Sequence, residues 1–171
     1  MMTKTRFPFH RLSLPLGLVL FLSACGEPTS TDSFVYKMGE KVQVGTMVFN
    51  VLEAEWRSEL PGDGMTQTPK NRFLVIKLSM TNSGGGQDTI PLLTLENAKK
   101  ESFLEVSEVK GLNRWLGLIR LVNPAATDEG QIVFDVPTGS YKLRVNDGKE
   151  TGSETTRLVE IPLALSEPIR N

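Results

Sequence analysis

The two residue types most often used in nucleophilic and metal chemistry occur once each in this chain of 171 residues. The single histidine, His10, and the single cysteine, Cys25, both lie within the first 25 residues. From residue 26 onward the chain therefore cannot assemble a Ser–His–Asp or Cys–His catalytic group, or a zinc site built from Cys and His. A disulfide within the chain is excluded because it needs two cysteines.

Serine–lysine and carboxylate chemistry remain open. The segment 107–110 has the S-x-x-K spacing of penicillin-binding proteins and β-lactamases, but the S-D-N and K-T-G elements of those enzymes are absent. Twenty acidic residues offer many pairs for a glycosidase, and no spacing singles one out. We therefore expect no catalytic residues, no cofactor and no metal. A carboxylate-based hydrolase acting on glycan or peptidoglycan is the alternative.

The first 24 residues have the layout of a secretory signal peptide. An apolar stretch, residues 12–22, follows a basic start and precedes the small residues Ser23 and Ala24. The stretch is too short to span a membrane, which needs about 20 apolar residues. Residues 22–25 (LSAC) resemble the bacterial lipobox. This resemblance implies cleavage before Cys25 and attachment of lipid there, palmitate included, and two or more acyl chains anchor a protein stably.

Residues 25–35 are small and polar, which is typical of a short tether between lipid and domain. Gly26 follows the cysteine where aspartate would resemble an inner-membrane retention signal, so an organism with two membranes is expected to sort the protein to the outer one. After residue 24 the chain has sixteen basic and twenty acidic residues, a net charge of −4. This balance does not favour nucleic-acid binding.

From residue 36 to residue 165 apolar residues mostly alternate with period two, which predicts strands. The clearest strand is 71–82, in which Leu74, Ile76, Leu78 and Met80 share one face. Further strands are expected at 41–44, 47–56, 89–95, 102–106, 131–136, 141–145 and 157–161. The short linker 137–140 predicts that the strands on either side of it form an antiparallel pair.

Several short strands separated by Gly/Pro turns predict an all-β fold, an immunoglobulin-like antiparallel β-sandwich. A short helix or turn is expected near residues 108–118, because Leu112, Trp115, Leu116 and Ile119 recur at helical spacing. Residues 123–130 are expected to form a loop, and residues 166–171 a C-terminal tail.

Three stretches carry the resemblance of this chain to a known family: residues 38–45, 73–82 and 129–137. Their order and spacing, behind a lipobox, are similar to those of the DUF4352 domains of exported bacterial proteins. The resemblance covers residues 36–162 and is weakest at 107–121. It implies an immunoglobulin-like sandwich on an extracytoplasmic lipoprotein, and it implies no catalytic or binding residues.

We therefore expect a membrane-anchored, non-catalytic binding or protein-interaction module of the cell envelope, facing a protein or glycan partner. A structural accessory subunit of an envelope complex is a further alternative. Trp56 and Trp115 are candidate contact residues because aromatic side chains dominate interface hot spots, although each also suits core packing. The loops 61–70 and 83–88 are the first candidates for a binding surface.

Overall fold

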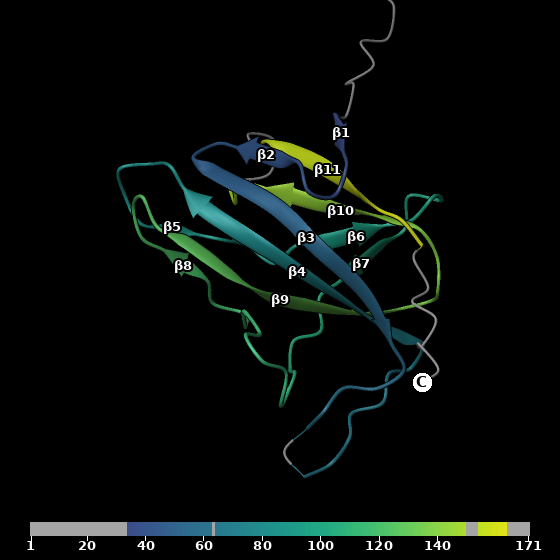
Figure 1. Cartoon of the computed structure of the whole chain (residues 1–171). Helices are drawn as coiled ribbons and strands as arrows, with labels where there is room; N and C mark the ends of the chain where they lie inside the picture. The colour runs from purple at the N-terminus through teal and green to yellow at the C-terminus, as the bar shows by residue number, and fades with distance from the viewer. Residues whose placement is uncertain (1–33, 63, 150–153, 164–171) are drawn as a thin grey trace, which may run out of the picture. The chain divides into compact units, whose positions relative to one another are not determined.

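Figure 1 shows a computed structural model of the chain, which describes residues 34–62, 64–149 and 154–163. The expected signal segment 1–24, the lipidation residue Cys25, its neighbour Gly26 and the expected tail 166–171 lie outside the described residues. Among the described residues no helix is long and apolar enough to cross a membrane.

Two β-sheets form a sandwich, as the sequence predicts (Figure 1). The five-stranded sheet has the order β1 (Val35–Tyr36), β11 (Thr156–Ile161), β10 (Tyr141–Asn146), β6 (Thr94–Glu96) and β7 (Ser102–Leu104). The four-stranded sheet has the order β2 (Lys41–Val44), β3 (Met47–Arg57), β4 (Arg72–Asn82) and β9 (Thr127–Val136). The short strands β5 (Asp88–Thr89) and β8 (Leu121–Val122) pair with each other. Neighbouring strands are antiparallel except β1 and β11, which are parallel.

The main core lies between the two sheets. The alternating residues of β4 predicted to share a face, Leu74 to Met80, are fully buried there, which confirms the expected strand. They pack against a set of fully buried residues from the five-stranded sheet: Leu95, Leu143, Val145 and Val159. Burial of apolar side chains on this scale is the main stabilising term in a domain without disulfides.

A second, smaller core covers the outer face of the four-stranded sheet. Phe73 and Val75 of β4 and Val133 of β9 are buried on this face. Two loop segments, 58–71 and 105–120, lie over these residues, and we call them the loop layer. They supply the remaining buried members of the cluster, Leu60 and Val109. The side chain of Gln67 joins the two segments by donating to the carbonyl oxygen of Lys110 over 2.7 Å.

The predicted pairing of 131–136 with 141–145 is wrong. Strand β9 pairs with β4 in one sheet, whereas β10 pairs with β11 and β6 in the other. Residues 137–140 carry the chain across the sandwich, so the two strands bury their apolar residues in the same core from opposite sides. Alternation shows which face of a strand is buried, but it does not show which strand lies beside it.

The segment near residues 108–118 forms a turn and not a helix, and no helix occurs among the described residues. Its backbone instead bonds to the free edge of β9, where Gln131 donates to Arg114 over 2.8 Å and accepts from Leu116 over 3.0 Å. The helical spacing is therefore misleading, and Ile119 is 82% exposed. This segment covers the edge of a strand that could otherwise pair with another chain.

Smaller differences concern where strands begin and end. Strand β9 starts at Thr127, inside the expected loop 123–130, and β1 starts at Val35, within the expected tether. The expected strand 89–95 is divided into β5 and β6, which belong to different sheets, with Pro91 between them. Proline lacks an N–H donor, so it suits the crossing between sheets and not the interior of a ladder.

Candidate functional site

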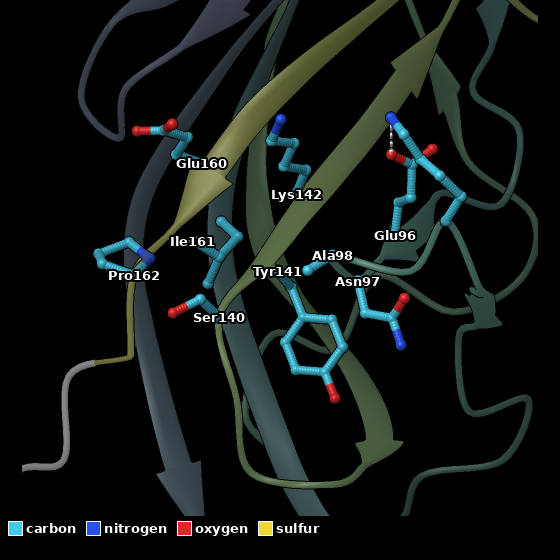
Figure 2. Close-up of a pocket in the computed structure, with 10 residues that line it drawn as sticks. Glu96, Asn97, Ala98, Ser140, Tyr141, Lys142, Glu160, Ile161 and Pro162 are labelled. Atoms are coloured by element: carbon cyan, nitrogen blue, oxygen red, sulfur yellow. Dashed lines mark hydrogen bonds and ion pairs between the residues drawn. The ribbon is translucent and has the colours of Figure 1, made fainter.

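A cavity of about 370 Å³ lies at one end of the five-stranded sheet (Figure 2). It forms where the end of β6, the start of β10 and the end of β11 meet, because β10 is antiparallel to both neighbours. Its lining is Glu96, Asn97, Ala98, Lys100, Ser140, Tyr141, Lys142, Glu160, Ile161 and Pro162. The cavity thus combines charged walls with an apolar floor.

Three charged side chains form a row across the sheet beside this cavity. Lys142 on β10 is in register with Glu96 on β6 and with Glu160 on β11. Residues directly opposite one another on adjacent strands lie on the same face of a sheet. The row therefore places one cation between two anions on the outward face.

Glu96 is already neutralised by two other cations. One carboxylate oxygen accepts from Lys100 Nζ over 2.7 Å, and the other accepts from Arg144 Nη2 over 3.0 Å. The hydrogen bond from Lys100 lowers the pKa of Glu96, and the bond from Arg144 adds to this effect against the opposing effect of burial. Glu96 is therefore a carboxylate at neutral pH and is poorly suited to donate a proton.

The pairing of Lys142 and Glu160 differs from that of Glu96. Within the described residues, neither the ammonium group of Lys142 nor the carboxylate of Glu160 forms a hydrogen bond or an ion pair, and the hydroxyl of Ser140 forms none. Lys142 is half-buried and the other two residues are exposed. These three polar groups are available to a ligand.

The rim of the cavity is held by the turn between β6 and β7. The side-chain oxygen of Asn97 accepts from the backbone N–H groups of Lys99 over 2.9 Å and of Glu101 over 3.0 Å. Lys100 in this turn has a left-handed backbone, with a φ of 67°. Side chains such as asparagine favour turns because they bond to nearby backbone in this way.

The floor of the cavity is built on an aromatic cluster. The ring of Tyr141 meets Phe103 edge-on at 5.7 Å and tilts against Trp56 at 6.2 Å. Its hydroxyl donates to the carbonyl oxygen of Pro137 over 2.6 Å, and burial raises the pKa of Tyr141. Tyr141 therefore supports the cavity by packing and stays uncharged at neutral pH.

The candidate contact residues predicted from the sequence, Trp56 and Trp115, do not line the cavity. Trp56 is 8% exposed within the main core, so the packing alternative describes its position. Trp115 is half-buried against the second core, and its indole Nε1 is buried without a hydrogen-bond partner among the described residues. Ser107 and Lys110 of the S-x-x-K spacing are exposed on the loop layer, where Lys110 pairs with Glu108 over 3.2 Å.

The two loops named from sequence do not line the cavity either. The loop 61–70 belongs to the loop layer, and the loop 83–88 is tied to Asn82 at the far end of β4. The described residues contain no group of three or more His, Cys, Asp or Glu side chains placed to hold a metal ion.

The structure thus defines a β-sandwich domain with a small cavity of mixed charge at the end of its five-stranded sheet. The family model of DUF4352, described as a domain of unknown function, matches residues 36–157, and the chain belongs to this family. This agrees with the resemblance seen in the sequence. None of the proteins with curated descriptions matches the chain.

Several solved structures share the fold. The yjhA protein of Bacillus subtilis is 20% identical, with a TM-score of 0.58, covering 74% of this chain and 98% of that one. The secreted protein MPT63 of Mycobacterium tuberculosis is 16% identical, with a TM-score of 0.55, covering 77% and 100%. The ycdA protein of Bacillus subtilis, described as a candidate lipoprotein, is 14% identical, with a TM-score of 0.52, covering 70% and 38%. At these identities the similarity shows the fold alone.

Proposed function

We propose that this chain is a lipid-anchored, extracytoplasmic binding module of the cell envelope without catalytic activity. The signal layout and Cys25 support export and anchoring. The descriptions of MPT63 as secreted and of ycdA as a candidate lipoprotein are in keeping with this location.

The observation that carries the binding role is the cavity whose walls include Lys142 and Glu160, which form no ion pair with any residue that the structure describes. Charged groups left without partners beside an apolar floor suit recognition of a polar ligand, because they can orient it while the floor excludes water. Glu96 and Lys100 are already paired with each other, which suits a preformed wall better than proton transfer. The partner is an envelope protein or glycan.

Anchoring is tested in cells given a palmitate analogue that can be detected after incorporation. The wild-type chain should carry the label and stay with the membrane fraction, whereas Cys25→Ser should lose the label and leave that fraction. In an organism with two membranes, the wild type should separate with the outer membrane and Gly26→Asp with the inner one. An unlabelled wild-type chain would overturn the anchor.

Binding is tested with the anchored chain in mild detergent, exposed to envelope extract. We expect a retained partner that Lys142→Glu loses, while Lys41→Glu on β2, an exposed lysine of the other sheet, retains it. Equal retention by all three chains would contradict a role for the cavity. Turnover of a glycan panel that Glu160→Gln abolishes would replace the proposal with the hydrolase. A partner that stays bound throughout purification would indicate an accessory subunit.

A further inference from the structure

We infer that the cavity at the end of the five-stranded sheet binds the C-terminus of a short peptide. The last residue of this peptide is small and apolar, and its free carboxylate pairs with the ammonium group of Lys142. This inference rests on the proposed binding function and names the ligand class for the same cavity.

The positive charge of Lys142 favours an anionic ligand. Glu96, its neighbour in the row, has both oxygens occupied by Lys100 and Arg144. Lys100 of the turn after β6 and Arg144 of β10 therefore satisfy the charge of Glu96, so this neighbour in the row is not available to pair with Lys142. A half-buried ammonium group without a partner is unfavourable, and an anion from a ligand would supply the missing charge.

Glu160, in the opposite wall of the cavity, determines which chemical group of the ligand can lie next to the ligand carboxylate. Glu160 on β11 is exposed, makes no ion pair in the described part of the chain, and lines the same cavity as Lys142. A carboxylate accepts hydrogen bonds and donates none, so it suits the N–H groups of a peptide backbone. A peptide terminus offers the two groups together, because its last amide N–H lies one residue from its carboxylate.

The apolar floor and the volume of the cavity limit the side chain that the terminal residue of the ligand can have. Ala98, Ile161 and Pro162 line the cavity together with the ring of Tyr141 (Figure 2). A volume of about 370 Å³ is at the lower end of the range for ligand pockets, about 300–1,000 Å³. A terminal residue with a methyl-sized side chain fits this floor, and the rim is held in place by the Asn97 turn before any ligand enters.

The test compares two probes that differ only in the terminal charge. Acetyl-Ala-Ala as the free acid and as the C-terminal amide are titrated calorimetrically into the anchored chain in detergent. We expect the acid to bind at least tenfold more tightly than the amide. Lys142→Gln should remove most of this difference, Lys142→Arg should retain it, and Lys41→Gln should match the wild type. Because the ammonium group of Lys142 is half-buried and has no partner in the described structure, Lys142→Gln should be at least as stable as the wild type in urea unfolding.

Equal affinity for acid and amide, or an unchanged affinity in Lys142→Gln, would overturn the inference. Glucuronic acid forms a further arm: if it binds through Lys142 and the peptide acid does not, the carboxylate comes from a sugar and the peptide class is wrong. If no probe binds while a partner from extract is still retained through Lys142, the ligand class fails and the proposed function stands. If that partner is absent too, the proposed function fails with it.

Discussion

Glu105 and Arg120 form a two-point ion pair that solvent does not reach, since each side chain is 1% exposed. Arg120 Nη1 donates to Glu105 Oε1 over 3.0 Å, and Nη2 donates to Oε2. The pair is tied to backbone at both ends, because Glu105 accepts from the N–H of Leu93 over 2.6 Å and Arg120 donates to the carbonyl oxygen of Gly117 over 2.9 Å. It joins the beginning of the segment 105–120 to its end.

Breaking this ion pair from one side is expected to destabilise the domain strongly. Glu105→Leu leaves a buried guanidinium without its partner, and such changes cost about 3–5 kcal/mol of unfolding free energy. The double variant Glu105→Leu/Arg120→Met removes both charges and should be more stable than either single variant. Urea unfolding followed by tryptophan fluorescence measures all four chains. A single-variant loss below about 1 kcal/mol would show that the pair contributes little.

Gly130 on β9 is expected to tolerate no side chain. A Cβ there would lie 2.5 Å from the carbonyl oxygen of Arg114 and 2.6 Å from a methyl group of Leu116. Gly130→Ala should therefore push the segment 105–120 off the edge of β9 and lower the unfolding free energy by about 1–3 kcal/mol. Gly86→Ala is the matched control, because nothing lies within 4 Å of a Cβ at that position. Equal stability of the two variants would contradict close packing at this edge.

Asn82 is expected to hold the glycine-rich loop after β4. Its buried amide donates to the carbonyl oxygens of Gly86 over 2.7 Å and Val122 over 2.9 Å, and its side-chain oxygen accepts from the N–H of Gly84 over 2.8 Å. Asn82→Asp loses both donors and buries a charge, so the unfolding free energy should fall by at least about 2 kcal/mol. Amide hydrogen exchange of residues 84–86 should accelerate. Asn113→Asp, on an exposed residue, should change neither quantity.

The ion pairs of Glu96 should make stability depend on pH in the acid range. Its pKa is lowered in the folded chain, chiefly by Lys100, so the charged form is favoured on folding. This contribution is present above the unfolded-state pKa, about 4.3, and is lost as pH falls through the lower folded-state pKa. Urea midpoints between pH 6 and pH 3 should therefore fall more steeply for the wild type than for Glu96→Gln. Parallel pH profiles for the two chains would exclude the effect.

The sequence predicts strands well where the signal is local. The alternation from Leu74 to Met80 reports the buried face of β4 because successive side chains of a strand point to opposite sides. The same reasoning fails for residues 107–121. There Gly111 and Gly117 adopt positive φ angles, and the backbone bonds to a strand that comes later in the sequence.

The candidate site could not be found in the same way. Glu96, Lys142 and Glu160 are far apart in sequence, and each resembles an ordinary charged residue on the outward face of a strand. Only the register of β10 with its two neighbours brings them into one row. The sequence favours the two tryptophans as candidate contact residues, but in the folded chain Trp56 is buried in the main core.

The sequence by itself determined the all-β class, the buried faces of the main strands, and the lack of any histidine or thiol after Cys25 for catalysis or metal binding. These properties follow from composition and from short-range periodicity. The tertiary structure alone decided that β9 and β10 lie in different sheets, that loops cover the outer face of β4, and that a cavity opens beside Lys142. The physical reason is that strand pairing joins residues distant in sequence, and the free energy that selects among pairings depends on the packing of the whole domain.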